Sequence, residues 1–510
     1  MSARTVVISP APTANGDLHL GHIAGPFLAA DVHTRYARSQ GREVLLGTGF
    51  QDTSTFVVTT AVRRGVTPEE LVATSAAQIA ASLEAMGIGV DGYTGDDDRF
   101  TKWVVDFVAR LHSAGKLELR TMKFPYSPKS GRFLVDGFAS GSCPECLADC
   151  CAGLCESCGQ LVAAGDLLDV RSTLDPTDPV ELREADVLVL PVEKYRARLQ
   201  EHFSAHVAGM RPHMAQAMAS MLARPLPDFP VTYPTSWGIE VPFPEVSGQR
   251  VNPNAEPMAW SMHATALAAG SAAGSSEDEL WLAGAGSEVV YFLGFDNIYP
   301  FAIAGPAMLL ALDGRYDLPA RYLTNEFYEL DHRKFSTSRG HVVWSRELAA
   351  EVPRDLIRFH LAATSPEHQR TSFSRDALAR VTSARLVEPW NRVADKVNRF
   401  AGLGPLPVSP RSRRAAARMA SRFAESYELD GFSLNRAAET ITEQLARLDA
   451  RAVTDANAGD FCFEVDRLLR GAAPILVDLA ERVLGEDAGA DAESFTPARL
   501  PRLREAEAGR

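Results

Sequence analysis

The chain has 510 residues, with 52 Lys and Arg against 65 Asp and Glu, so its formal net charge is −13. Apolar residues make up 46% and charged residues 23% of the composition, which is typical of a folded globular protein of roughly three domains. This composition excludes a disordered chain, a collagen-like fibre and a disulfide-rich secreted scaffold. The acidic balance argues against sequence-independent coating of DNA but leaves room for a basic patch that binds one RNA.

The sequence carries no recognisable targeting segment. Its start, MSARTVVISPAP, has a short apolar run broken by prolines, and no stretch of about 20 uninterrupted apolar residues follows. Six of the seven cysteines fall between Cys143 and Cys158. We therefore expect a cytoplasmic protein without a membrane span, in which clustered cysteines indicate a metal before they indicate disulfides.

The predicted elements divide the chain into four segments. Residues 1–115 alternate strand patterns (5–8 and 42–47) with helix patterns (19–37, 71–86 and 102–114), which favours a parallel sheet. Residues 116–230 hold the cysteines and then one helix pattern over 202–223. Residues 231–375 return to a buried strand at 288–293, after loops at 225–244 and 269–278. Residues 376–510 are helical, and their polar end, 485–510, is expected to fray.

The first motif that carries chemistry lies between the first predicted strand and helix. It spans Ala14–His22 and has the sequence ANGDLHLGH. The predicted helix begins near His19, so the imidazoles of His19 and His22 lie at its positive end, where backbone N–H groups favour phosphate. Gly21 removes a side chain, so a flat base or ribose can approach the backbone. Taken alone, the two histidines could equally be helix caps.

The second motif is the small cationic segment Lys334–Gly340, KFSTSRG. A lysine on such a loop can follow the charge that develops on a transferring phosphate. Taken alone, a solvated basic turn is the simpler interpretation.

The cysteines have the spacing of a metal site. Cys143-x2-Cys146-x8-Cys155-x2-Cys158 supplies two pairs of thiolates, the usual ligand set of a structural zinc. Four thiolates leave no open position for catalysis. Cys150 and Cys151 lie inside the loop and could replace a ligand or be ordinary loop residues.

With both motifs in this order, the chain resembles the class I aminoacyl-tRNA synthetases, and among them the methionyl-tRNA synthetases of archaeal and eukaryotic type. His19–His22 is similar to the HIGH motif of that class and Lys334–Ser338 to its KMSKS loop. The resemblance covers about three-quarters of the chain and includes 14–41, 237–244, 292–310 and 325–344. It implies an α/β fold, in which a Rossmann-like parallel sheet carries an inserted zinc-knuckle connective domain and is followed by a C-terminal α-helical bundle.

The resemblance also implies a reaction. An ATP-dependent ligase of this class lets a substrate carboxylate attack the α-phosphate of Mg·ATP, so that pyrophosphate leaves and an acyl-adenylate forms; AMP is released later. The catalytic residues implied are His19, His22 and Lys334. The ATP-binding residues implied are Asn15, Gly21, Gly294, Asp296, Asn325, Glu326, Ser336 and Ser338. The matching insertion implies one zinc, because the place of a second knuckle, 171–178, has no cysteine.

The expected substrate pocket departs from the family pattern. Its predicted residues are Ala11, Thr13, Asp52, Trp260 and Phe301. Thr13 replaces the usual Tyr, Phe301 lies in the segment that lacks the usual His, and Trp260 is not followed by Asp-Ala-Pro. The acid that binds the α-ammonium survives only as Asp52, shifted along its strand. A pocket without that acid should bind methionine badly, because a charged ammonium would be left unpaired. The alternative is a drifted but working methionine site.

The C-terminal helices lack the family's marks of anticodon binding. The last tryptophan is Trp390, ahead of the region where a base-stacking Trp is expected, and the usual Asn and Arg fall near Asn398 or Arg399 and Leu403. Since stacking contributes about 1–3 kcal/mol per base, its loss weakens tRNA selection. The basic run Arg411–Arg414 could contact phosphate or be a solvated helix face.

Three hypotheses follow. The favoured one is a tRNA-independent amide-bond ligase that activates an amino acid or related acid and transfers it to a small amine. The alternative is a tRNA ligase for methionine or a methionine analogue. The third, a catalytically silent RNA- or protein-binding relative, is disfavoured by the intact His19, His22 and Lys334. In each case we expect a monomer that binds neither DNA nor membranes.

Overall fold

The computed structural model describes residues 4–95, 97–271, 275–335, 341–485, 487, 489 and 492–506. The chain forms two compact units, each built from separate stretches of sequence. Unit 1 contains Met1–Asp17, Gly41–Ala81 and Gly89–Asn325, and unit 2 contains Leu18–Gln40, Ser82–Ile88 and Glu326–Arg510. The four predicted segments are continuous along the chain, whereas each unit combines three separate stretches of sequence. The two divisions do not correspond, so the boundaries of the four segments stay a prediction.

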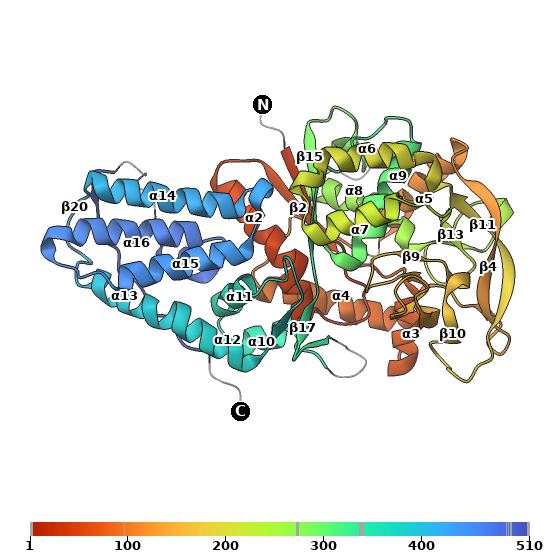
Figure 1. Cartoon of the computed structure of the whole chain (residues 1–510), viewed down its shortest axis with the longest axis horizontal. Coiled ribbons are helices and arrows are strands. Elements are labelled where there is room, and N and C mark those ends of the chain that lie inside the picture. The colour runs from red at the N-terminus through yellow and green to blue at the C-terminus, as the bar shows by residue number, and fades with distance from the viewer. Residues whose placement is uncertain are drawn as a thin grey trace. The chain divides into compact units, whose positions relative to one another are not determined.

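Unit 1 is built on a five-stranded sheet in the order β16-β15-β1-β2-β3, in which every pair is parallel. The strands are β1 (Arg4–Ile8), β2 (Val44–Gly49), β3 (Gly92–Thr94), β15 (Ser287–Gly294) and β16 (Arg321–Asn325). β15 lies between β1 and β16 although most of unit 1 precedes it in sequence. The parallel sheet that the alternating pattern predicts is therefore present (Figure 1).

Helix α8 (Pro257–Ala268) packs on β2 and β3. Its sequence, PMAWSMHATALA, is apolar on nearly every face, as expected of a helix buried on all sides. The packing is so close that a Cβ on Gly92 of β3 would lie 2.1 Å from the carbonyl oxygen of Ala264. α5 (Asp98–Ser113) packs on α8, and the indole nitrogen of Trp103 donates to the Ala259 carbonyl at 3.0 Å. α8 is thus held firmly against the sheet.

A long insertion between β3 and β15 forms separate small sheets. One has the order β12-β11-β4-β5, two others adjoin the clustered cysteines, β10-β6-β7 and β8-β9, and the fourth is the pair β13-β14. The strands are β4 (Glu118–Ser127), β5 (Arg132–Phe133), β6 (Ala139–Ser142), β7 (Asp149–Cys151), β8 (Gly153–Leu154), β9 (Leu161–Val162), β10 (Leu168–Ser172), β11 (Glu181–Leu190), β12 (Phe229–Pro230), β13 (Thr232–Tyr233) and β14 (Arg250–Val251).

The single helix expected over 202–223 is wrong. Two helices occupy this region, α6 (Arg196–His206) and α7 (Pro212–Leu222). The break falls at Arg211, whose ψ of 145° is extended, because a residue before proline is disfavoured in the α conformation. Pro212 then opens α7 at a position where its missing N–H costs nothing.

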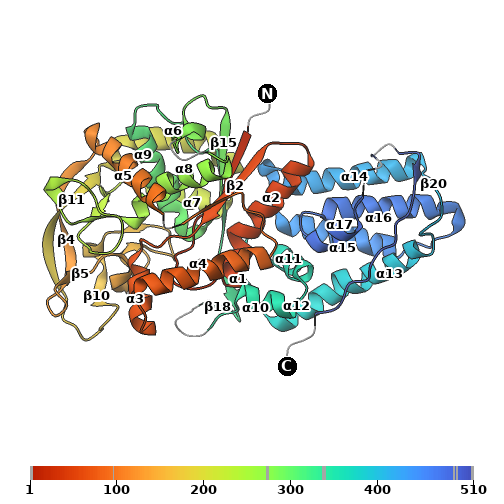
Figure 2. The same ribbon diagram turned by 180° about the vertical axis from the view of Figure 1, so that it is seen from behind.

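Unit 2 is mainly helical (Figure 1). Its helices are α1 (Leu20–His22), α2 (Leu28–Ser39), α10 (Ser345–Glu351), α11 (Arg354–Ala363), α12 (Arg375–Thr382), α13 (Glu388–Asn398), α14 (Pro410–Tyr427), α15 (Leu434–Asp449), α16 (Ala458–Ala472) and α17 (Val477–Val483). α14, α15 and α16 pack on one another, and α17 packs on α11 and α16, as seen from behind in Figure 2. The predicted C-terminal helical bundle is confirmed.

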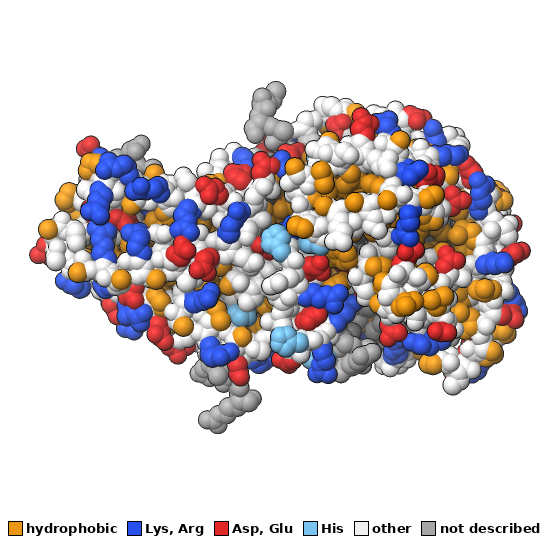
Figure 3. Space-filling view, in the orientation of Figure 1, with side chains coloured by type: hydrophobic (Ala, Val, Ile, Leu, Met, Phe, Trp, Pro, Cys, Tyr) orange, Lys and Arg blue, Asp and Glu red, His pale blue; other side chains and the backbone are white. Residues whose placement is uncertain are grey.

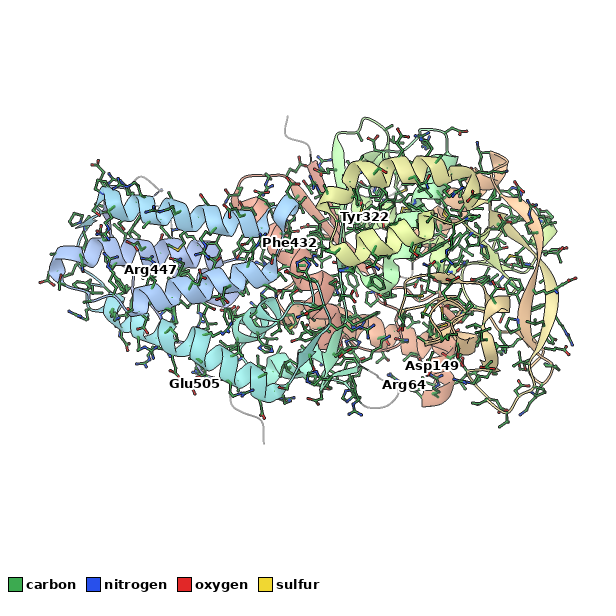
Figure 4. All side chains as sticks on the ribbon, in the orientation of Figure 1. Arg64, Asp149, Tyr322, Phe432, Arg447 and Glu505 are labelled. Carbon is green, nitrogen blue, oxygen red and sulfur yellow. The ribbon has the colours of Figure 1, made fainter. Side chains whose placement is uncertain are left out.

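Buried ion pairs connect the elements of unit 2. Arg358 of α11 is fully buried and donates to Asp31 of α2 at 2.6 Å, while its other N–H groups reach the carbonyls of Met86, Pro474 and Ile475. In the bundle, Arg447, labelled in Figure 4, donates to Glu464 of α16 at 2.7 Å. The buried carboxylates of Asp31 and Glu464 therefore each have a guanidinium partner.

The expectation that residues 485–510 fray is wrong for 492–506. β21 (Ser494–Phe495) pairs with β20 (Leu406–Pro407), and Leu500 and Leu503 are buried. Side chains of α13 hold this segment: Asn398 bonds both the N–H and the carbonyl of Leu500, and Asn391 does the same for Leu503. Composition could not reveal these partners, which come from a helix about a hundred residues earlier.

Among the described residues, no helix is both long and apolar enough to cross a membrane.

Exposed arginines gather along one face of α14 at positions 411, 414, 418 and 422, and blue side chains mark this face in Figure 3. The basic run of the sequence is therefore a solvent-facing helix surface.

Candidate functional site

The first motif forms the start of the helical segment in unit 2. His19 is the N-cap of α1, with extended backbone (φ −89°, ψ 167°), and its Nδ1 accepts from the Gly21 N–H at 3.1 Å. His22 reaches back, and its Nδ1 accepts from the His19 N–H at 3.3 Å. A ring nitrogen that accepts is unprotonated, so in each neutral imidazole the proton lies on Nε2. Both rings therefore have an Nε2–H available for donation to another group.

An aromatic stack fixes the orientation of these rings. The centroids of His19 and His22 lie 3.9 Å apart, and the ring of Phe335 lies 4.7 Å from His19 and nearly parallel to it. A Cβ on Gly21 would lie 2.9 Å from the His19 ring and 3.3 Å from Phe335. Gly21 thus makes room for the aromatic stack itself. The sequence predicts only that Gly21 lets a base or ribose approach the backbone.

The second motif begins in a hairpin of unit 2. β17 (Tyr328–Leu330) pairs with β18 (Arg333–Lys334), and the two loop residues, Asp331 and His332, have φ of 47° and 61°. Two positive φ values characterise the tight turn that matches the twist of a hairpin. The turn places exposed Lys334 immediately before Phe335, with its Nζ 5.2 Å from the centre of the Phe327 ring. Ser336 and Ser338 lie outside the described residues.

Electrostatics tie the two motifs together. Burial and the charge of Lys334 lower the pKa of His22 to about 4, and burial, His22 and Lys334 lower the pKa of His19 well below its usual value. Both imidazoles are therefore neutral at physiological pH. An anion placed among these three side chains would be attracted by the ammonium of Lys334 and would accept from both Nε2–H groups.

Other predicted nucleotide-binding residues lie at the carboxyl ends of two adjacent strands in unit 1. Gly294 ends β15 and Asn325 ends β16, and the two are paired in register. A Cβ on Gly294 would lie 2.6 Å from Oδ1 of Asp296, whose pKa is raised by burial. In open parallel sheets, ligands bind beyond these strand ends. Asn15 lies in the loop after β1. Glu326 directly follows β16 and is the first residue of the stretch Glu326–Arg510, which belongs to unit 2.

A pocket in unit 1 contains three of the five predicted substrate residues, Ala11, Trp260 and Phe301. It is lined also by Pro10, Gln51, Pro253, Asn254, Glu256, Pro257, Asn297 and Pro300. Thr13 and Asp52 are not part of this lining. Thr13 forms a parallel bridge with Gln51, and the backbone oxygen of Asp52 accepts from the indole nitrogen of Trp237 at 2.8 Å.

The pocket holds an acid that sequence reasoning missed. Glu256 precedes α8 and is only 1% exposed. Its Oε2 accepts from Thr53 Oγ1 at 2.7 Å and from Gln51 Nε2 at 3.2 Å. Burial raises the pKa of Glu256 to about 8, against these hydrogen bonds and with the help of the negative charges of Asp52 and Asp136. The signal in the sequence that could have indicated this buried acid is a glutamate immediately before Pro257, at the start of an apolar helix.

The four predicted zinc ligands converge in unit 1. The sulfurs of Cys143, Cys146, Cys155 and Cys158 all lie within 4.8 Å of one another. Two of the separations are 3.8 Å (Cys143 to Cys158) and 3.6 Å (Cys146 to Cys155). A tetrahedral site with Zn–S bonds of about 2.3 Å requires sulfurs about 3.8 Å apart. The donor set and its spacing therefore fit zinc.

The two halves of this cluster repeat the same turn. The N–H of Leu147 donates to the Cys143 carbonyl and that of Gly159 to the Cys155 carbonyl, at 2.9 and 2.7 Å. Leu147 and Gly159 both adopt left-handed φ, 61° and 71°. Cys150 and Cys151 lie on β7 and are not in the four-sulfur group.

Comparison with known proteins places these features in context. The family described as tRNA synthetases class I (M) matches residues 5–400. A methionine--tRNA ligase of Porphyromonas gingivalis is 33% identical over 385 residues, which cover 74% of this chain and 55% of that protein. A methionine--tRNA ligase of Roseiflexus is 32% identical, covering 76% of this chain and 67% of that one. The chain spans little more than half the length of most such relatives.

Solved structures agree on the fold. A methionyl-tRNA synthetase of Mycobacterium tuberculosis, bound by methionyl-adenylate, superposes with a TM-score of 0.73 at 18% identity, covering 99% of both chains. At that identity the likeness establishes the architecture only.

Proposed function

Because the chain belongs to the class I tRNA synthetases of the methionyl type, a family of ATP-dependent ligases, we propose that it activates an amino acid with ATP. The products of this step are pyrophosphate and an enzyme-bound aminoacyl-adenylate. The observation that carries the proposal is the cluster of His19, His22 and Lys334, in which the imidazoles stack on each other and the ammonium charge lowers the pKa of both.

The cluster is suited to hold the phosphates of ATP. The Nε2–H groups of His19 and His22 donate to phosphate oxygens, and the helix N-terminus favours the same charge. As the bond to the α-phosphate breaks, negative charge grows on pyrophosphate, and Lys334 stabilises it. Mg²⁺ enters as part of the nucleotide substrate. Ser336 and Ser338 complete the loop in this proposal, as the family resemblance implies.

Residues of unit 1 and its border take the remaining roles in this proposal. Gly294 and Asp296 bind the ribose, and Asn15, Asn325 and Glu326 contribute to the nucleotide site. Ala11, Trp260 and Phe301 line the amino acid pocket, to which Thr13 and Asp52 are also assigned by resemblance. Cys143, Cys146, Cys155 and Cys158 hold one structural zinc, which would stabilise the insertion without entering the reaction.

The relatives favour methionine as the acid and tRNA as the acceptor over the tRNA-independent ligase expected from sequence. We propose a tRNA ligase first and keep transfer to a small amine as a second candidate. One observation favours the second: both polar ends of the Asn398 side chain bond Leu500, and the Trp390 indole is buried and donates to the Pro501 carbonyl. Neither side chain is then available to a base.

ATP–pyrophosphate exchange across a panel of amino acids, with and without tRNA, tests this proposal. Lys334→Ala should lower the exchange rate at least tenfold, whereas Arg333→Ala, its exposed neighbour in the same hairpin, should leave it nearly unchanged. Charging of tRNA with the activated acid supports the ligase for tRNA. Exchange without any charging of tRNA supports the small-amine ligase, and no exchange with any acid rejects the proposal.

A further inference from the structure

Glu256 contributes a carboxylate oxygen to the unit 1 pocket that lacks a partner. Thr53 and Gln51 both bond Oε2, while Oε1 has no hydrogen-bond partner among the described residues, although the side chain is 99% buried. If Glu256 is ionised, Oε1 is an unsatisfied acceptor. If Glu256 is protonated, the proton lies on Oε1, since Oε2 already accepts two hydrogen bonds. The O–H group at Oε1 then has no acceptor among the described residues. Either state costs about 1–3 kcal/mol or more, which a ligand could recover.

The surroundings favour a cation as that ligand. Asp52 and Asp136 add negative charge at Glu256, and the described lining of the pocket includes no Lys, Arg or His. An anion would therefore be repelled. The rings of Trp260 and Phe301 belong to the same lining, and aromatic faces attract cations.

Trp260 supplies a second unsatisfied group. Trp260 follows Glu256 by four residues, so the two side chains share one face at the start of α8. The backbone N–H of Trp260 donates to the backbone carbonyl of Glu256 at 2.8 Å. Trp260 is 3% exposed, and its Nε1–H has no acceptor among the described residues. A ligand that satisfies both residues carries an ammonium and, near it, an acceptor atom.

We propose that Glu256 binds the ammonium group of the substrate and thereby restricts this enzyme to acids that carry a protonated amine. The inference rests on the proposed adenylation and specifies its substrate class. The sequence predicts Asp52 as the ammonium-binding acid, but Asp52 does not line the pocket. Glu256 supplies the carboxyl group from a different element, the start of α8, and Thr53 and Gln51 orient it.

The test compares acids that differ only in the amine. Methionine is paired with 4-(methylsulfanyl)butanoic acid, and lysine with 6-aminohexanoic acid and hexanoic acid, within a panel of the twenty amino acids in ATP–pyrophosphate exchange. The variant is Glu256→Gln, which keeps an oxygen for Thr53 and Gln51 but removes the charge. Glu279→Gln, exposed on a short 3-10 turn of the same unit (Glu279–Trp281), is the matched control.

We expect Glu256→Gln to raise KM for the amine-bearing acid at least tenfold with less than a threefold change in kcat, and to leave KM for ATP unchanged. The lysine series shows whether Glu256 recognises the α-ammonium or a distal ammonium of the substrate. Equal activation of an acid and its des-amino counterpart by the unmodified enzyme, or equal KM in the two glutamine variants, overturns the inference while adenylation stands. Failure to activate any acid rejects the adenylation proposal itself.

Discussion

Replacing Glu256 by glutamine should change how the stability of the protein depends on pH. Burial holds the pKa of Glu256 at about 8 in the folded chain, against 4.5 for an ordinary glutamate. Between these values the unfolded chain releases the proton and the folded chain keeps it. A group with a raised pKa in the folded state stabilises fully below the unfolded value, and this stabilisation is lost as pH rises towards the folded value.

The magnitude follows from the same two values. At about 1.4 kcal/mol per pH unit, unmodified protein loses up to about 5 kcal/mol of folding free energy between pH 4.5 and pH 8 through this one group. Glu256→Gln cannot ionise and avoids the loss, while keeping an acceptor for Thr53 and Gln51. The variant should match the parent near pH 5 and exceed it at pH 8, by up to about 10 °C in apparent Tm at roughly 2 °C per kcal/mol.

Thermal unfolding at half-unit intervals from pH 5 to pH 8 measures this difference. The parent, Glu256→Gln and the surface control Glu279→Gln are compared, so the titration of every other group cancels. A gap between parent and Glu256→Gln that stays constant across this range would show that Glu256 ionises normally, and the reasoning from burial would be refuted.

Four other outcomes are expected. Cys155→Ser should reduce the zinc content of purified protein from about one per chain to near zero by metal analysis, whereas Cys150→Ser should retain it; equal zinc in both would contradict the four-ligand site. Arg358→Ala leaves Asp31 buried without its partner and should destabilise the chain by about 3–5 kcal/mol in urea unfolding, and a cost below 1 kcal/mol would show that the pair is dispensable. Because His22 has a pKa of about 4, kcat/KM for exchange should show no His22 titration between pH 5.5 and 7.5, and a loss of rate below pH 6.5 that is absent in His22→Asn would refute its neutrality. Asn398→Ala leaves the N–H and carbonyl of Leu500 unpaired and should make the segment 492–506 sensitive to proteolysis at protease levels that spare the parent, which limited digestion with mass spectrometry can decide.

Much of the fold was predictable because it rests on local patterns. The strand and helix periods of residues 1–115, the strand at 288–293 and the helical C-terminal segment depend on short-range propensities and burial patterns, and the corresponding elements are β1, β2, α4 (Pro68–Ala85), α5, β15 and α12–α17. The errors at 202–223 and 485–510 have different causes. A proline interrupted a helix whose apolar pattern continued through it, and a polar tail found partners on α13 that lie far away in sequence.

The cysteine spacing and the two phosphate-handling motifs were visible in the sequence alone, because each depends on residues close together along the chain. Only the tertiary structure revealed the stack of Phe335 on His19, the position of Cys150 and Cys151 outside the four-sulfur group, and the place of Glu256 in the pocket. A glutamate in an apolar helix start looks like an ordinary cap until its surroundings are known. Its charge state is set by burial, by Thr53 and Gln51 from the segment after β2, and by Asp52 and Asp136, and these residues come together only when the sheet and α8 are packed. The sequence determined which reactive groups the protein has, and folding decided which of them face a ligand, because desolvation and Coulomb interactions depend on distance in space.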